Sequence, residues 1–216
     1  YSLVQLWHSP SASTGSGDTI SEKVTDAPVH RLPPIGTVFG RLSQYADVIA
    51  VFADTHGIEN PQFAGREADV LEDAERTLHA GDFTTGAVYD AFKRRAQTLI
   101  AVHGNSDASS LQNQLPAVRT IEWRDWQLPI VHGHEHTPTS LSLLAREREA
   151  DLVVTGHTHR PAIARLGEVP VLDPGSHAEP RTGPPTHAEL REQKGTLVIE
   201  IRDQAGGVVE REPATE

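Results

Sequence analysis

Five short apolar stretches in the middle of the chain each run into a residue able to bind a metal ion, with a glycine beside it. They are FADTHG at 52–57, LHAGDF at 78–83, VHGNSD at 102–107, IVHGHEH at 130–136 and VVTGHTHRP at 153–161. In α/β folds the strands fix positions, and the loops after them carry the chemistry. The chain is therefore constrained to a fold in which several strand ends meet at one site.

The length and composition indicate one domain with an aliphatic core. The chain has 216 residues, of which 37% are hydrophobic and only 5% aromatic. Such a chain is long enough for one substantial core and too short for two ordinary domains with long tails. We expect a leader at 1–46, a folded domain at 47–202 and a polar tail at 203–216, in which Val208 and Val209 could extend a final hairpin strand.

The apolar patterning predicts alternating strands and helices, followed by a half rich in strands. The run VIAVF at 48–52 is typical of a central strand covered on both faces. Helices are predicted at 66–78, at 84–96 with Thr84 or Thr85 as the cap, and at 140–150. Further strands are predicted at 98–105, 117–123, 127–132, 151–155, 169–173 and 195–202. This order favours two stacked sheets with helices outside.

The candidate ligands are carboxylate, amide and imidazole side chains. The chain has no cysteine, so a metal must be held by oxygen and nitrogen atoms. Such a mixed set suits Mn²⁺, Zn²⁺, Fe or Co rather than Ca²⁺ alone. Side chains at positions i and i+2 of an extended segment point the same way, so Asp54 with His56, and His157 with His159, can face one region.

Each cluster alone could also have an ordinary structural role. Asp82 could cap a helix, and Asn105 could be an ordinary turn residue. The order and context of all five clusters together are far more specific for a metal site.

The motifs D-x-H, G-D, G-N-x-D, H-G-H and G-H-T-H, in this order, resemble those of the calcineurin-like metallophosphoesterase superfamily. The compact size and LDPGS at 172–176 resemble its small bacterial and archaeal phosphodiesterases. The resemblance covers roughly residues 47–201 and implies a four-layer α/β/β/α sandwich of two mixed sheets flanked by helices.

The resemblance also implies two divalent ions, with Mn²⁺ expected first and Ni²⁺, Co²⁺, Fe²⁺ or Zn²⁺ left open. It assigns Asp54, His56, Asp82 and His159 to the first ion. It assigns Asp82, Asn105, His132 and His157 to the second. Asp82 would then be the bridge, because a carboxylate can neutralise two adjacent cations.

The expected reaction is hydrolysis of a phosphate ester by a hydroxide that bridges the two ions, because two cations lower the pKa of bound water toward about 7. Asp82, Asn105 and His134 are the residues expected to act in catalysis. Many relatives carry His where this chain has Ser106, which leaves the proton donor open between His134 and His103, either of which could instead orient ligands.

Other residues receive more modest predictions. His177 is placed in a loop near the site, with substrate contact as one option, and His187 on or near a late strand. Arg160 is either a phosphate contact or a solvated surface residue. His8 and His30 fall in the leader and are expected to play no part.

The net charge of −11 argues against sequence-independent nucleic-acid binding, which needs a basic face. We therefore expect a small phosphate ester or a nucleotide as substrate. No apolar run approaches the length of a membrane span, and the first 20 residues lack a secretory signal, so the cytoplasm is the expected location. The sequence leaves open whether the protein forms a homo-oligomer.

Two other classes compete with this interpretation. One is a metal-binding scaffold on the same fold with little or no turnover, as in the retromer subunit of this superfamily that has lost part of its metal set. Here all seven ligand positions are kept, which favours an enzyme. The other is a metallo-β-lactamase-like hydrolase, but its opening HxHxDH cluster is missing.

We predict that Asp82→Asn weakens the binding of both ions together, because the bridge would lose its charge. Metal content and phosphoesterase activity of the purified variant measure this. Normal activity would contradict the bridging assignment.

Overall fold

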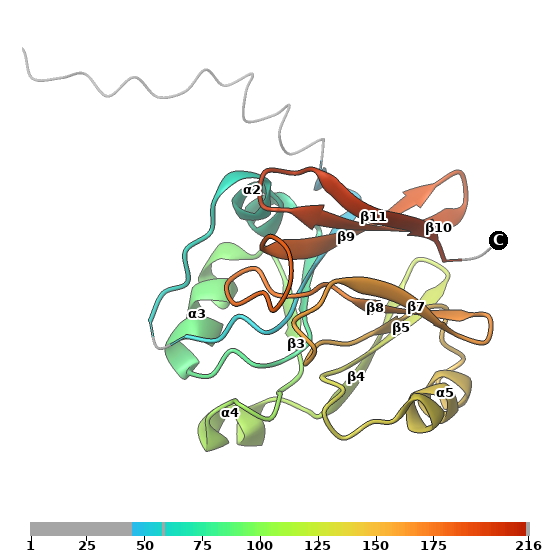
Figure 1. The fold of residues 1–216 in the computed structure, drawn as a ribbon, viewed down its shortest axis with the longest axis horizontal. Helices are drawn as coiled ribbons and strands as arrows, with labels where there is room; N and C mark the ends of the chain where they lie inside the picture. Colours follow the sequence, from blue (N-terminus) through green and yellow to red (C-terminus); the bar gives the residue numbers. More distant parts are fainter. Residues whose placement is uncertain (1–44, 58, 215–216) are drawn as a thin grey trace, which may run out of the picture. The chain divides into compact units, whose positions relative to one another are not determined.

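Strand β1 (Val48–Phe52) lies inside one of two sheets, and all five of its residues are buried. The computed structural model describes residues 45–57 and 59–214. The predicted leader therefore lies outside the described residues, except for Tyr45 and Ala46. The described residues belong to one unit of the chain, and its elements are shown in Figure 1.

The sheet that contains β1 has six strands in the order β11-β10-β9-β1-β2-β3. β1 pairs in parallel with β2 (Arg76–His79), which pairs in parallel with β3 (Leu99–Ala101). On its other side β1 is antiparallel to β9 (Thr186–Gln193). β10 (Thr196–Asp203) and β11 (Val208–Pro213) continue this antiparallel half.

The second sheet has five strands in the order β4-β5-β6-β8-β7. Its members are β4 (Val118–Trp123), β5 (Trp126–Val131), β6 (Val153–Val154), β7 (Ala162–Leu166) and β8 (Val169–Asp173). β5, β6 and β8 are parallel neighbours, whereas β4 and β7 close the edges in antiparallel. Both sheets are therefore mixed, as predicted.

Three clusters of buried side chains define four layers. The largest joins the facing surfaces of the two sheets, with Val51, Leu78, Ile130 and Leu172 among its members. A second packs α2 (Gly65–Asp73), α3 (Gly86–Arg95) and α4 (Ser109–Gln114) on the outer face of the six-stranded sheet. A third packs α5 (Pro138–Glu147) and the residues after it on the outer face of the five-stranded sheet. The predicted α/β/β/α sandwich is confirmed.

The predicted helix at 66–78 is wrong in its second half. The helix ends at Asp73, and residues 76–79 form β2, where Thr77, Leu78 and His79 are buried beside β1. Pairing with a central strand overrides the local helix propensity here. The helix at 84–96 appears as α3, and the Thr85 side chain accepts a hydrogen bond from the N–H of Val88 at its start.

Two elements inside the predicted domain, β7 and the short helix α4, had no counterpart in the sequence prediction. A late strand is predicted on or near His187 without bounds, and this strand is β9. The strand β9 has the sequence THAELREQ, and its buried Glu189 is paired with Arg66 and Arg191. A strand that buries paired charges lacks the apolar pattern on which the prediction depends.

The segment predicted as a polar tail contains β11, which includes Val208 and Val209 and pairs with β10. Ala214, just after this strand, is buried in the core between the sheets. No described helix is long and apolar enough to cross a membrane.

Candidate metal centre

The candidate ligands follow the carboxyl ends of five strands, three from one sheet and two from the other. Asp54 and His56 follow β1, Asp82 follows β2, and Asn105 follows β3. His132 is the residue after β5, and His157 and His159 follow β6. Because these strands are parallel within each sheet, the loops after them lie at the same edge.

Short distances connect the seven side chains into one cluster. The Nε2 atoms of His56 and His159 are 3.1 Å apart, and His159 Nε2 lies 3.6 Å from Asp54 Oδ1. Asp82 Oδ2 lies 3.6 Å from His56 Nε2 and 3.2 Å from His132 Nε2. His132 Nε2 is also 3.2 Å from Asn105 Oδ1. The ring of His157 lies 5.3 Å from that of His132, centre to centre.

The backbone is left-handed at five of these seven residues. The φ angles are 53° at Asp54, 40° at His56, 62° at Asp82, 73° at His157 and 55° at His159. Residues with a β-carbon adopt this conformation at an energetic cost, which is typical of functional sites where the surrounding structure enforces it. Asp54 with His56, and His157 with His159, therefore lie in left-handed turns and not in the extended segments from which their common direction was predicted.

The hydrogen bonds of His132 show that its Nε2 atom is suited to a cation. Its Nδ1 lies 2.8 Å from the carbonyl oxygen of Ala80, which can only accept, so Nδ1 carries the proton. In the neutral ring, Nε2 then presents a lone pair toward the oxygens of Asp82 and Asn105. A nitrogen lone pair repels two oxygen atoms that face it. A proton on the nitrogen, or a cation between the three atoms, removes this repulsion.

The pKa of His132 follows from this arrangement. Burial alone would lower it, but the hydrogen bond and negative charge of Asp82 outweigh burial and raise it above its ordinary value. A proton therefore supplies the positive charge in the metal-free protein, and a metal ion could supply it in its place.

A similar arrangement surrounds Asp54. His159 donates through Nδ1 to the carbonyl oxygen of Glu179 at 2.7 Å, so its Nε2 lone pair points toward His56 and Asp54. The Oδ1 atom of Asp54 is buried and has no hydrogen-bond partner among the described residues. A buried carboxylate oxygen without a donor is costly unless it binds a cation. The residues therefore fit a metal ion here as well.

Two overlapping groups of three side chains could each hold a metal ion. Within each group the possible ligand atoms lie within 4.8 Å of one another. One consists of Asp54, His56 and His159, and the other of Asp54, Asp82 and His132. All of these side chains are buried or half-buried. The cluster therefore has enough side chains for two ions, and each group includes at least one carboxylate.

The two central carboxylates titrate in opposite directions. Burial raises the pKa of Asp54 to about 7, although the charge of His132 opposes the rise. Burial would also raise the pKa of Asp82, but the hydrogen bond and charge of His132 and the N–H of Ser106 hold it well below its ordinary value. Asp82 is therefore the permanently ionised carboxylate of the pair.

Asp107, the last residue of G-N-x-D, holds two of the loops together. Its carboxylate accepts hydrogen bonds from the N–H groups of Asp82 (3.1 Å), Gly104 (2.8 Å) and Thr84 (2.7 Å). Gly104 also has a steric role, because a β-carbon there would lie 2.1 Å from Asp82 Oδ1. The sequence motif included Asp107 but gave no reason for it.

Ser176, within the LDPGS segment, is a second supporting residue whose role the sequence did not reveal. Its hydroxyl donates to the carbonyl oxygen of Asp54 at 2.6 Å and accepts from the N–H of Glu179 at 2.7 Å. Glu179 in turn accepts from His159. This loop therefore fixes Asp54 and His159 from behind.

The other residues singled out in the sequence differ in exposure and in their distance from the candidate ligands. His134 is partly exposed, with its ring 5.3 Å from that of His132 and 6.2 Å from that of His157. His103 is half-buried, and its Nδ1 lies 3.4 Å from the carbonyl oxygen of Gly104. Arg160 is exposed. His8 and His30 lie outside the described residues.

The suggestion that His177 contacts substrate is wrong. Its ring is buried and lies behind Thr55, to which its Nε2 is hydrogen-bonded at 3.0 Å. His187 lies on β9, as predicted.

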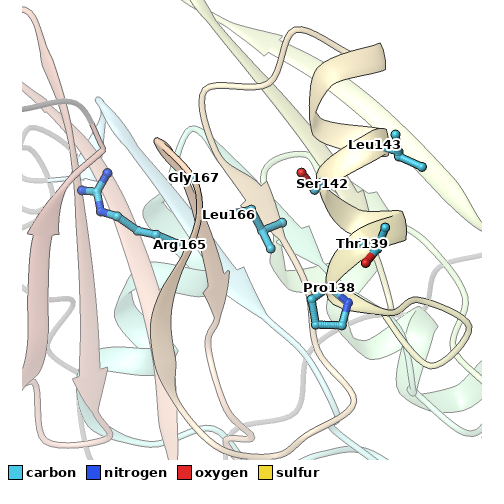
Figure 2. A pocket seen from close by; sticks show the side chains of 7 residues that line it. All are labelled: Pro138, Thr139, Ser142, Leu143, Arg165, Leu166 and Gly167. Carbon is cyan, nitrogen blue, oxygen red and sulfur yellow. The ribbon is translucent and has the colours of Figure 1, made fainter.

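A separate cavity of about 420 Å³ lies between α5 and the β7–β8 hairpin (Figure 2). Its lining includes Pro138, Leu143, Arg165 and Leu166, and it contains no aspartate, glutamate or histidine. It therefore lacks the side chains of a metal centre and shares no residue with the candidate site.

The four-layer fold and the cluster of acidic and histidine side chains at its strand ends define a metallohydrolase-like protein. Residues 48–195 match the calcineurin-like phosphoesterase superfamily domain. This match spans more than half of the chain, and the chain belongs to that superfamily.

Relatives in bacteria and archaea carry related names. A protein of Methanothermobacter thermautotrophicus named "probable metallophosphoesterase" is 32% identical over 71% of this chain and 91% of its own. Phosphodiesterase YfcE of Escherichia coli is 28% identical over 78% of this chain and 90% of its own. The Zn²⁺ complex of Vps29 from Entamoeba histolytica has a TM-score of 0.62 and 23% identity, and covers 78% of this chain and 99% of its own. This last likeness concerns the fold alone.

We predict that metal affinity falls as the pH is lowered from 8 to 6. Burial raises the pKa of Asp54 to about 7, and below that value a cation must displace a proton from it. His132, whose pKa is also raised, adds to the same trend. We expect up to about a tenfold loss per pH unit for each displaced proton. Calorimetric titration with Mn²⁺ measures this, and equal affinity at pH 6 and 8 would contradict it.

Proposed function

We propose that the protein is a metal-dependent phosphodiesterase that holds two divalent cations. The observation that supports this most directly is the environment of His132 and Asp82. Oδ2 of Asp82 and Oδ1 of Asn105 each lie 3.2 Å from Nε2 of His132, and a cation that replaced the proton of His132 would be stabilised by all three atoms. The name of the Escherichia coli relative supports a diester rather than a monoester substrate.

The distances support the two ligand sets implied by the sequence resemblance. Asp54, His56 and His159 would hold the first cation together with Asp82. His132, Asn105 and His157 would hold the second together with Asp82. Asp82 is the better bridge, because one of its oxygens lies within 3.6 Å of both His56 and His132. The other oxygen of each carboxylate already accepts a backbone N–H, from Ser106 at Asp82 and from His157 at Asp54.

Cations bound by these residues would attract the phosphoryl oxygens and lower the pKa of water to about 7, so that hydroxide is available at neutral pH. The chain itself supplies orientation. The amide nitrogen of Asn105 donates to the hydroxyl of its neighbour Ser106 at 3.2 Å, which turns the amide oxygen toward His132. The proposed proton donor to the leaving group is His134, which is partly exposed and whose ring lies 5.3 Å from that of His132.

We propose Mn²⁺ as the first cation to test, as the sequence resemblance implies; the three oxygen donors suit it, and the four imidazoles are the reason to test Ni²⁺, Fe²⁺ and Zn²⁺ beside it. A phosphate ester of small size or a nucleotide is the proposed substrate. The acidic net charge of −11 disfavours a long nucleic acid held without regard to sequence.

The scaffold alternative shares the fold and the metal site but predicts no turnover. A substrate panel separates the two. The metal-stripped protein is refilled with Mn²⁺, Ni²⁺, Co²⁺, Zn²⁺ or Mg²⁺ and assayed on bis(p-nitrophenyl) phosphate and p-nitrophenyl phosphate. We expect a higher kcat/KM on the diester with at least Mn²⁺. Bound metal without turnover for any ion would favour the scaffold.

His134→Ala tests the proposed proton donor. Aliphatic leaving groups need a proton, whereas nitrophenolate leaves without one, so we expect the variant to lose more activity on alkyl esters than on nitrophenyl esters. Loss factors on the order of 10²–10⁴ are typical of a general acid. His136→Ala, two residues further along, is the matched control. Equal losses on both ester types would remove His134 from this role, and the same comparison with His103→Ala tests its rival.

A further inference from the structure

A chain of buried hydrogen bonds runs behind the candidate metal centre and passes through Thr55. This residue lies between Asp54 and His56 and has no role in binding metal. Its hydroxyl oxygen is 2.8 Å from Nε2 of His79 and 3.0 Å from Nε2 of His177. All three side chains are buried, at 0% exposure for Thr55 and His79 and 3% for His177.

The direction of the hydrogen bond between His79 and Thr55 is fixed by the N–H of Gly81. The backbone N–H of Gly81 can only donate, and it donates to Nδ1 of His79 at 3.2 Å. Burial lowers the pKa of His79 well below its ordinary value, so the ring is neutral and its one proton sits on Nε2. His79 therefore donates to Thr55.

Among the described residues, Nε2 of His177 is the remaining hydrogen-bond partner of the Thr55 hydroxyl, which therefore donates its proton to it. Burial lowers the pKa of His177 to about 3, so this ring is neutral as well and accepts the hydrogen bond through Nε2. Its own proton must be on Nδ1. That atom has no hydrogen-bond partner among the described residues, and Oε2 of Glu67 lies 3.9 Å away.

Phenylalanine rings hold the two histidines in place. His79 stacks on Phe83 at 3.7 Å, and His177 stacks on Phe63 at 5.0 Å between ring centres. Phe52 and Phe92 pack edge-on against His177. Four of the five phenylalanines of a chain poor in aromatics are thus used here. Neither imidazole can turn without displacing this packing.

The chain of hydrogen bonds connects three loops of the metal centre. Thr55 belongs to the loop with Asp54 and His56, and Gly81 precedes Asp82. His177 belongs to the loop whose Ser176 donates to the carbonyl oxygen of Asp54. The same loop accepts the proton of His159 at Glu179. The Thr55 hydroxyl is therefore hydrogen-bonded to side chains from both of the other segments, in addition to the backbone hydrogen bonds that join its own turn to that of Asp82.

We propose that Thr55 is a positioning residue, whose hydroxyl holds the Asp54–His56 turn against the Asp82 turn and so assembles the metal centre before a cation arrives. The inference rests on the proposed metal site. Backbone hydrogen bonds from the N–H groups of Asp54 and His56 to the carbonyl oxygens of Gly81 and Asp82, each 3.0 Å, also join these two left-handed turns, and the Thr55 hydroxyl adds the side-chain link that extends to the loop of His177.

Nitrogen-15 NMR of the histidine rings in the metal-free protein tests the hydrogen-bond direction without any substitution. We expect His79 to carry its proton on Nε2 and His177 on Nδ1. The opposite protonation of either ring would overturn the proposal.

Thr55→Val tests the positioning role, because it removes the hydroxyl and keeps the shape. We expect the affinity for Mn²⁺, measured by calorimetry, to fall by about 10–100-fold, as for other residues that orient metal ligands. Thr55→Ser restores the hydroxyl and should restore the affinity. Thr77→Val is the matched control, since Thr77 is equally buried and its hydroxyl has no hydrogen-bond partner among the described residues.

The outcomes separate this proposal from the proposed function. If the unsubstituted protein does not bind Mn²⁺ or the other divalent ions, the proposed function fails. If the unsubstituted protein binds and Thr55→Val binds equally well, only the positioning role fails, even where Thr55→Val lowers the melting temperature. If Thr55→Val does not fold, the comparison of Thr55→Ser with the unsubstituted protein and the NMR result decide.

Discussion

The burial of two carboxylates, Asp54 and Asp82, at neighbouring strand ends is the constraint on which the site depends. Both are almost inaccessible to solvent, at 0% and 2% exposure. Two like charges taken out of water destabilise a fold unless donors or cations surround them. The N–H of Ser106 and the ring of His132 stabilise Asp82, whereas Asp54 keeps one oxygen without a donor among the described residues. This oxygen of Asp54 is therefore a position at which a cation can bind.

Assembling such a site requires strained turns, and the fold fixes them from behind. Five of the seven candidate ligands have a positive φ angle. The carboxylate of Asp107, the hydroxyl of Ser176 and the hydroxyl of Thr55 each tie two or more of the loops together. The two sheets supply a rigid base, because their facing surfaces are packed into one apolar core. Rigid strands with tied loops keep ligands in position before binding, which lowers the entropic cost of capturing a metal ion.

Much of the fold and site could be predicted from the sequence, because the signals were local. The apolar run at 48–52 predicted a buried strand, and the predicted cap, Thr84 or Thr85, is Thr85 at the start of α3. The seven candidate ligands followed from strand ends and motif order, and the structure brings them together. The failures have a common cause. Strand β2 reads locally as helix, and β9 carries Glu189, so each is a strand only because a neighbour pairs with it or neutralises its charge.

The sequence by itself determined which residues can bind metal and at which ends of which apolar runs they lie, because residue type and period are written along the chain. Only the tertiary structure decided which loops face one another. It showed that Nε2 of His132 lies 3.2 Å from Asp82, that burial raises the pKa of Asp54 whereas His132 and Ser106 hold the pKa of Asp82 low, and that the buried ring of His177 is hydrogen-bonded to Thr55. These properties depend on distance and burial between residues far apart in sequence, such as Thr55 and His177, which no local pattern records.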